Sequence, residues 1–273
     1  MRLGIFAKTF PGTDPASVLA QVKAAGFATA QYNMACSGLP SMPDAIAPAV
    51  STAIAEASRQ TGIPLCAVSG TYNMAHPNPA IRARGLRQLE VIAGACAAMG
   101  TSLVTLCTGT RDPDDQWRHH SDNSSAEAWR DMRTEMQKVA AIAERFGLRL
   151  GIEPELANIV DSALKARRLL DEMKSDRLAI VLDPANLFER AELVEQRRIV
   201  SEAVDMLADR VVMAHAKDRA ADGGFAIAGK GVIDFPHYLR CLRSAGFDGD
   251  LVAHGLGAHE AAGVAVFLGH SLR

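Results

Sequence analysis

The chain has 273 residues, of which 48% are hydrophobic and 22% are charged, and its formal net charge is −2. This composition is ordinary for a globular protein with a sizeable core. Nucleic-acid-binding proteins usually carry a basic excess, because neutralising phosphates supplies most of their affinity, and this chain has none. No apolar run approaches the roughly 20 residues that a membrane span requires. We therefore expect neither a nucleic-acid partner nor a membrane partner.

The cysteines favour a reducing compartment. They are odd in number, widely spaced, without a C-x-x-C pair, and set among apolar residues: Cys36, Cys66, Cys96, Cys107 and Cys241. This usage is typical of buried free thiols. The apolar run near the N-terminus is too short for the core of a secretion signal. We therefore expect a cytoplasmic protein.

Eight short apolar segments alternate with longer amphipathic segments along the whole chain. Most of them are continuously apolar, which is typical of parallel strands that are covered on both faces. The predicted strands are 3–7, 29–34, 64–70, 102–107, 148–154, 178–183, 210–216 and 250–256.

Capping residues mark helices between these strands. Asp14 and Pro15 open the first helix, because a cap residue followed by proline suits a first turn, and Gly26 follows its end. Glycines also follow the ends of several later helices, as is common at helix C-termini. The sequence predicts these later helices over 78–99, 124–146, 161–173 and 236–245.

The repeating order of strand, loop and helix predicts the fold. Eight such units in a chain of this length match the (β/α)₈ barrel, or TIM barrel, which typically takes about 250 residues. A doubly wound sheet uses the same alternation, but it requires a nucleotide fingerprint that the chain lacks. No Ser/Gly-rich, Pro-rich or like-charge run marks a linker. We predict a single TIM-barrel domain over residues 1–273.

The last four predicted strands end in residue types that ligate metals. They are Glu153, Asp183, His215 and His254. In a TIM barrel the active site lies at these strand ends, and an ionisable group there is costly unless it is paired or coordinated. Carboxylates with imidazoles suit Mn, Co, Fe or Zn better than Mg. We predict one divalent metal ion; a hydrogen-bonded network that only holds the rim together is the alternative.

Four motifs follow these strands: E-P-E at 153–155, D-x-A-N-L-F at 183–188, H-x-K-D at 215–218 and G-x-G-x-x-D at 229–234. With them, the chain resembles the sugar phosphate isomerase/epimerase group of xylose-isomerase-like TIM barrels. In that group a Glu, an Asp, a His and a second Glu at the end of the last strand hold the metal. The resemblance implies Glu153, Asp183 and His215 as ligands, whereas His254 stands where the second glutamate is expected.

The resemblance implies an isomerase or epimerase that converts a ketose, keto-sugar or keto-polyol through an enediolate intermediate. Glu153 is the candidate base, and His254 is a candidate ligand or proton-transfer group. Because the second glutamate is missing, two alternatives stay open. One is a metal-dependent dehydratase or lyase on a keto-acid or keto-polyol, and the other is a non-catalytic sugar-binding barrel. Asn186, where related endonucleases often carry a histidine, argues against a phosphodiesterase.

Further polar residues near the predicted strand ends are candidates for contact with a small, carbohydrate-like substrate. They are His76, Asn186, Lys217, Glu155, Arg111 and Trp117. Arg111 and Trp117 lie in the long polar loop 108–120, and long loops on a catalytic face are often lids or specificity elements. For Lys217 a rim salt bridge is the alternative role, and for His76 it is stabilisation of its turn. Because barrels of this group often associate, a homo-oligomer also stays open.

Overall fold

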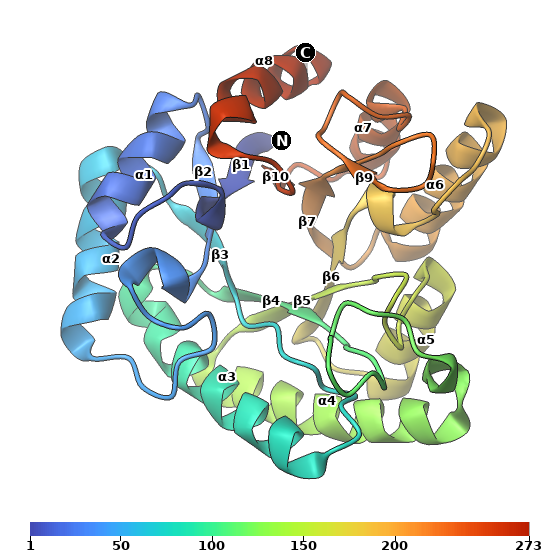
Figure 1. The fold of residues 1–273 in the computed structure, drawn as a ribbon, viewed down its shortest axis with the longest axis horizontal. Helices are drawn as coiled ribbons and strands as arrows, with labels where there is room; N and C mark the ends of the chain where they lie inside the picture. Colours follow the sequence, from blue (N-terminus) through green and yellow to red (C-terminus); the bar gives the residue numbers. More distant parts are fainter. Residues whose placement is uncertain (273) are drawn as a thin grey trace.

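The computed structural model describes residues 1–272, in which parallel strands close into a barrel (Figure 1). The ring order is β1, β2, β3, β4, β5, β6, β7 and β10, with β10 pairing back to β1. The predicted (β/α)₈ barrel is confirmed. The strand bounds are β1 (Arg2–Phe6), β2 (Thr29–Tyr32), β3 (Leu65–Ser69), β4 (Leu103–Cys107), β5 (Arg149–Glu153), β6 (Leu178–Leu182), β7 (Val211–Ala216) and β10 (Asp250–Ala253).

Helices surround the barrel on the outside, and α8 lies beside β1, so that the two ends of the chain are close together (Figure 1). Their bounds are α1 (Pro15–Ala24), α2 (Pro48–Thr61), α3 (Pro79–Met99), α4 (Ala126–Phe146), α5 (Ala163–Met173), α6 (Leu193–Leu207), α7 (Phe235–Ser244) and α8 (Ala261–Ser271). Within residues 1–272, none of the helices combines the length and the apolar character needed to cross a membrane.

Side-chain caps separate the helices that the sequence predicted from those that it did not. In α1 the Asp14 carboxylate accepts a hydrogen bond from the Ser17 amide at 2.9 Å, and Asn78 caps α3 in the same way. The helices α2, α6 and α8, which were not predicted, have no side-chain hydrogen bond at their N-caps. Packing against the barrel therefore defines these helices without the local signal that a cap provides.

The barrel interior is a small apolar cluster separate from the larger core between strands and helices. It consists of Ala67, Val181, Met213 and Val252. Gly151 on β5 faces the same interior, because a Cβ atom there would lie 2.7 Å from the Val181 side chain. Successive side chains of a strand alternate between faces. The interior residues therefore fix which strand-end side chains point into the barrel mouth.

A short antiparallel hairpin of β8 (Asp218–Arg219) and β9 (Phe225–Ala226) follows β7, and the sequence did not predict it. The buried Asp218 carboxylate anchors the segment beyond it by accepting hydrogen bonds from the amides of Gly229, Gly231 and Ile233, each at 3.0 Å. These bonds hold the hairpin at the barrel mouth, where Phe225 lines the cavity described below.

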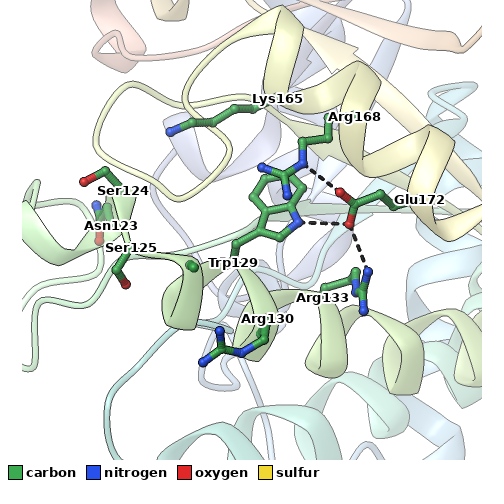
Figure 2. Close-up of a pocket in the computed structure, with 10 residues that line it drawn as sticks. Asn123, Ser124, Ser125, Trp129, Arg130, Arg133, Lys165, Arg168 and Glu172 are labelled. Carbon is green, nitrogen blue, oxygen red and sulfur yellow. Dashed lines mark hydrogen bonds and ion pairs between the residues drawn. The ribbon is translucent and has the colours of Figure 1, made fainter.

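Glu172 joins α5 to α4 on the outside of the barrel (Figure 2). Its carboxylate accepts hydrogen bonds from Trp129 Nε1 at 3.0 Å, Arg168 Nε at 2.7 Å and Arg133 Nη1 at 3.1 Å. These donors lower the pKa of Glu172 to about 2, and the hydrogen bond from Trp129 contributes most. The Arg168 guanidinium also lies 4.0 Å from the centroid of the Trp129 ring. The cluster thus fixes the two helices that flank β5 in the sequence.

Candidate metal centre

Strand alternation brings the four predicted ligands to one point in the barrel mouth. Each lies two residues after an interior position, and side chains two apart on a strand share a face. The pairs are Gly151 with Glu153, Val181 with Asp183, Met213 with His215, and Val252 with His254. One ligand atom from each of the four residues lies within 4.8 Å of the others.

The four side chains form two carboxylate–imidazole pairs. His215 Nδ1 lies 3.1 Å from Glu153 Oε1, and His254 Nε2 lies 2.9 Å from Asp183 Oδ2. The centroids of the two imidazole rings are 4.3 Å apart. Asp183 is 1% exposed, so its charge depends on these neighbours for stabilisation.

Residues outside the cluster orient its members. His215 Nε2 donates to Gln31 Oε1 at 2.8 Å, and Gln31 Nε2 donates to Thr105 Oγ1 at 3.0 Å. This bond places a proton on Nε2 and turns the Nδ1 atom of His215 toward the carboxylates, as the outer partner of a metal-bound histidine does. Asn186 Nδ2 donates to Glu153 Oε1 at 2.9 Å. Asn186 therefore supports Glu153 and does not line the cavity.

Asp183 begins a short 3₁₀ turn, which fixes the direction of its carboxylate. Its Oδ1 atom accepts a hydrogen bond from the Ala185 amide at 2.9 Å. The other oxygen, Oδ2, faces His254 and lies 3.6 Å from Lys217 Nζ. One oxygen is thus used by the backbone and the other is directed into the cluster.

Protonation in the cluster reflects burial working against close opposite charges. Burial opposes ionisation of Glu153, but the adjacent His215 imidazolium outweighs it, and the pKa of Glu153 falls below its usual value. Burial likewise disfavours the charged form of His215, but Glu153 outweighs it and raises the pKa of that imidazole. For His254, burial and the neighbouring His215 cation lower the pKa, which favours the neutral ring.

The donor set fits a divalent transition metal. Two carboxylates and two imidazoles combine the oxygen and nitrogen ligands that Mn, Fe, Co and Zn accept, whereas Mg prefers oxygen alone. The convergence of the four ligand atoms within 4.8 Å and the Gln31 bond behind His215 are both features of a metal site. Glu153, Asp183, His215 and His254 would hold the ion.

A cavity of about 420 Å³ opens above the cluster. One part of its wall carries ionisable side chains, namely Glu153, Glu155, His215, Lys217 and His254. Another part carries uncharged polar side chains, namely Gln31, Asn33, Ser41, Ser69, Thr71 and Thr105. Burial raises the pKa of Glu155 to about 7, with Lys217 opposing the rise and Glu153 adding to it. Glu155, Lys217 and Trp117 line this cavity, and their contact with a substrate stays a prediction.

The structure does not bring His76 and Arg111 to this cavity, contrary to the expectation that they contact substrate. His76 Nε2 donates to the Pro113 carbonyl at 3.0 Å, and His76 Nδ1 accepts from the Asn78 amide at 2.9 Å. The buried Arg111 guanidinium binds Asp131 at 2.8 Å. Both side chains instead hold loops of the catalytic face in place.

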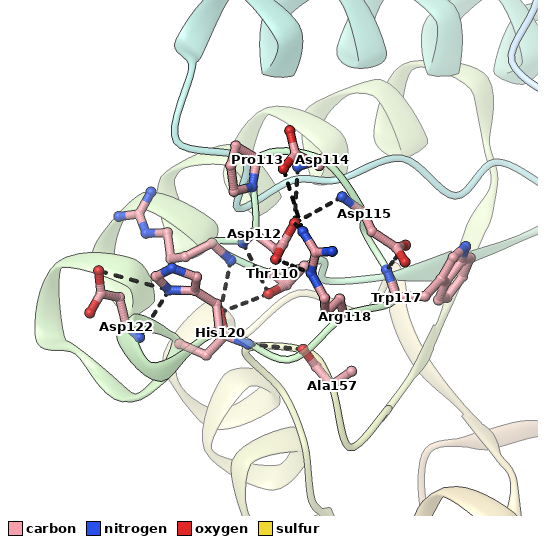
Figure 3. Close-up of polar contacts among 12 residues, drawn as sticks. Thr110, Asp112, Pro113, Asp114, Asp115, Trp117, Arg118, His120, Asp122 and Ala157 are labelled. Atoms are coloured by element: carbon pink, nitrogen blue, oxygen red, sulfur yellow. Dashed lines mark hydrogen bonds and ion pairs between the residues drawn. The ribbon is translucent and has the colours of Figure 1, made fainter. Parts of the chain in front are cut away.

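The loop between β4 and α4 is ordered by Asp112 (Figure 3). The Asp112 carboxylate accepts hydrogen bonds from the Asp114 and Asp115 amides, both at 2.9 Å, and from Arg118 Nη2 at 2.8 Å. Hydrogen bonding from Arg118 holds the pKa of Asp112 well below its usual range. Asp115 Oδ1 in turn accepts from the Trp117 amide at 2.9 Å. The network presents Trp117, which is 51% exposed, at the cavity.

Sequence reasoning missed several residues that line the cavity. Gln31 and Thr105 lie on β2 and β4 in the first half of the barrel, and neutral polar residues of this kind are also common on strands without a functional role. Lys8 and Phe225 lie in a short turn and in the unpredicted hairpin. The spacing of Gln31 could have identified it, because Gln31 lies two residues after Thr29 and therefore on the same face of the strand.

The fold and the site define a TIM barrel with a candidate metal centre of two carboxylates and two imidazoles at its strand ends. The sequence profile of the xylose isomerase-like TIM barrel family matches residues 19–256. The chain belongs to this family. No curated protein matches the sequence.

Several solved structures share the fold across nearly their whole length. The 3-keto-D-glucoside 4-epimerase of E. coli is 17% identical and has a TM-score of 0.78, with 99% of each chain covered. An L-ribulose 3-epimerase is 18% identical, with a TM-score of 0.77, and the match covers 99% of this chain and 94% of that one. A D-allulose 3-epimerase from Methylomonas sp. is 17% identical, with a TM-score of 0.76, and the match covers 100% of this chain and 98% of that one.

Proposed function

We propose that the protein is a cytoplasmic, divalent-metal-dependent isomerase or epimerase of a ketose or keto-sugar. The observation that carries the proposal is the convergence of Glu153, Asp183, His215 and His254 within 4.8 Å in the barrel mouth. A divalent ion held there supplies Lewis acidity, which polarises a carbonyl group and makes the neighbouring C–H bond more acidic. The structurally similar proteins are named as epimerases of keto-sugars, which supports the same substrate class.

Glu153 is suited to remove the proton. Its Oε1 atom is held by His215 Nδ1 and Asn186 Nδ2. Among residues 1–272, its Oε2 atom has only a weak contact, with Cys107 Sγ at 4.0 Å. One oxygen of the carboxylate is therefore fixed in place while the other is left to accept a proton from a substrate in the cavity.

His254 is the partner of Glu153 on another strand. It comes from β10, whereas Glu153 comes from β5, and both side chains line the cavity. Its lowered pKa keeps the imidazole neutral near pH 7, which suits either a metal ligand or a proton acceptor. Glu155, the other carboxylate in the cavity, lies at the same strand end as Glu153. Because both carboxylates share that end, transfer of a proton between neighbouring carbons on one face is favoured over inversion by a carboxylate pair.

Exchange of substrate C–H protons with solvent tests this proposal. The protein is incubated in D₂O with each of Mn²⁺, Co²⁺, Fe²⁺ and Zn²⁺ and a panel of ketoses, and deuterium next to the carbonyl is measured by NMR. Glu153→Gln is expected to slow exchange by about 10² to 10⁴, the usual contribution of a positioned base. Glu56→Gln, an exposed carboxylate on α2, is the control and should leave exchange unchanged. No exchange with any ion would contradict the proposal.

A metal-dependent dehydratase or lyase is the second candidate. It is favoured because the last strand brings a histidine, His254, and not a second glutamate, to the cluster that contains Glu153. In this reaction a β-hydroxyl group leaves after the proton is removed. Product mass distinguishes the two reactions, because dehydration loses one water and isomerisation loses none. Metal binding without either reaction would indicate the sugar-binding alternative.

A further inference from the structure

Lys217 is a buried cation at the edge of the candidate metal centre. The residue is 7% exposed, and its stem lies against Gly255, where a Cβ atom would be 3.3 Å from Lys217 Cδ. The ammonium group lies 3.8 Å from the centroid of the Phe225 ring. Gly255 has a φ of +73°, a conformation that side chains rarely adopt, so the space for the lysine stem is built into the backbone. Lys217 is therefore held in one place beside the cavity that it lines.

The charge of Lys217 is only partly balanced by the protein. Its Nζ atom donates to Asn186 Oδ1 at 3.3 Å, and within residues 1–272 Asp183, at 3.6 Å, is its one carboxylate neighbour in ion-pair range. Asp183 Oδ2 also binds His254. A divalent cation held by Asp183 and Glu153 would balance the charge of both carboxylates. The buried ammonium would then have no free carboxylate in ion-pair range, which is unfavourable.

Within residues 1–272, no carboxylate other than Asp183 lies in ion-pair range of Lys217. Glu155, which lines the same cavity, acts on Lys217 and Arg219 only from beyond that range. The carboxylate of Asp218 is occupied by the backbone amides of Gly229, Gly231 and Ile233. Arg219, itself a buried cation, lies 4.0 Å from the centroid of the Phe225 ring and adds positive charge on this side. The two cations beside Phe225 therefore lack a carboxylate in direct contact that a bound metal would leave free, which favours an anion from outside the protein.

We propose that the substrate carries a carboxylate next to its keto group and that Lys217 binds this carboxylate. A carboxylate in contact with Nζ, at about 2.8 Å, would lie no more than about 6.4 Å from Asp183 Oδ2, which is close enough for it to be attached beside the carbonyl that the centre would bind. The uncharged polar wall, with Asn33, Ser69 and Thr71, suits the hydroxyl groups of the remaining chain. The substrate class is a polyhydroxylated 2-keto acid.

A carboxylate fits this position better than a phosphate. Phosphate monoesters carry nearly two negative charges at neutral pH, and Lys217 offers one positive charge. Glu155 lines the same cavity and, when ionised, opposes a dianion more strongly than a monoanion. Lys8, which follows β1, also lines the cavity. Its Nζ atom donates a hydrogen bond to Ser41 Oγ at 3.4 Å. This inference rests on the proposed function, because it assumes that the four-residue centre binds a metal.

A matched pair of ligands tests the inference. 2-Keto-D-gluconate and D-fructose differ only in a carboxylate in place of a hydroxymethyl group next to the keto carbon. Their affinities for the metal-loaded protein are measured by calorimetry, and metal content is measured separately. The wild type should prefer 2-keto-D-gluconate by at least about tenfold, as expected for one charge-assisted hydrogen bond. Lys217→Met should lose most of this preference, with metal content and D-fructose affinity unchanged. Lys217→Arg should retain part of it, and Lys8→Met should retain it fully.

Three results would overturn the inference. Equal affinities for the two ligands, or binding of neither, would show that no carboxylate is recognised. A preference that survives in Lys217→Met would assign it to direct chelation by the metal. Tighter binding of D-fructose 1-phosphate than of 2-keto-D-gluconate would assign the site to phosphate. If the wild type binds no metal at all, the proposed function fails as well, so the two failures are distinguishable.

Discussion

The two halves of the barrel mouth carry different chemistry at the same structural positions. Strands β1 to β4 bring uncharged polar groups to the cavity, including Gln31, Ser69 and Thr105. Strands β5, β6, β7 and β10 end in ionisable residues, which converge on one point. In both halves, side chains on the inward face of each strand reach the cavity, so the difference lies in residue type.

This difference follows from the cost of burying charge. An isolated ionised side chain in the barrel mouth is strongly unfavourable, but carboxylates and imidazoles in contact stabilise one another. Ionisable residues are therefore gathered on neighbouring strands, as the Glu153–His215 and Asp183–His254 pairs show. Neutral polar residues need only hydrogen bonds, so they can be spread over the opposite wall, where hydroxyl groups of a substrate can bind.

A hydrogen bond between side chains connects the neutral wall of the cavity to the candidate metal centre. Gln31 on β2 accepts from His215 on β7, and it donates to Thr105 on β4. The neutral half thus sets the orientation of a ligand in the ionisable half. The predictions below test this division of roles, beginning with the ionisable half.

The largest effect is expected from removing metal from the ionisable half. Treatment with a chelator should lower the rate of substrate proton exchange by about a thousandfold or more, because Lewis acidity contributes several kcal/mol. Adding Mn²⁺, Co²⁺, Fe²⁺ or Zn²⁺ should restore it, and Mg²⁺ should restore it least. Circular dichroism of the metal-free protein serves as the control for folding. Full activity after complete removal of metal would contradict the division.

The link between the halves should have the next largest effect. Gln31→Met removes the acceptor for His215 Nε2 while keeping a similar volume. Metal affinity should fall by about 10- to 100-fold, as is usual when the outer partner of a metal-bound histidine is lost. Calorimetric titration with Zn²⁺ measures this change. Ser69→Ala is a matched control, since Ser69 lines the same cavity without contacting a ligand, and its metal affinity should equal that of the wild type.

A smaller effect is expected from the neutral half acting on substrate. Ser69→Ala should raise KM by about two- to tenfold, the size of one neutral hydrogen bond, and leave kcat nearly unchanged. Steady-state kinetics on the substrate found by proton exchange gives both constants. A two- to tenfold fall in kcat would instead show that Ser69 takes part in the chemical step. That result would contradict the division of roles between the halves.

The smallest effect should come from outside the mouth. The pKa of Glu172 is lowered to about 2, so its stabilisation of the fold is complete above the usual glutamate pKa near 4.5 and is lost as the pH falls toward 2. Glu172→Gln should therefore be less stable than the wild type at pH 7, and the difference should shrink on acidification. Urea unfolding at pH 7, 4 and 3 measures it. A difference independent of pH would rule out the carboxylate charge as its source.

The sequence allowed the barrel and the four ligand candidates to be predicted because both depend on short-range rules. Continuous apolar runs marked the strands, and a polar residue at the end of each run marked the mouth. His254 was found by this rule even though the family resemblance called for a glutamate. The helices with side-chain caps were found for a similar local reason, as Asp14 shows.

The parts that could not be predicted depend on packing between distant segments. Arg111 was expected at the substrate, but its partner is Asp131 on α4, and only the packed loop shows this. Gln31 reaches His215 from 184 positions away in the sequence, and glutamine in a strand carries no distinctive signal. Helices α2, α6 and α8 lack side-chain hydrogen bonds at their N-caps, so this local signal is missing from all three.

Elemental analysis of the purified protein tests the central claim most directly. The wild type is compared with the Glu153→Ala, Asp183→Ala double variant, which removes both carboxylates of the centre. The account predicts close to one Mn, Co, Fe or Zn ion per chain in the wild type and none in the variant, with both proteins folded. No metal in the wild type, even after each ion is added, would contradict it and favour a hydrogen-bonded network without a metal.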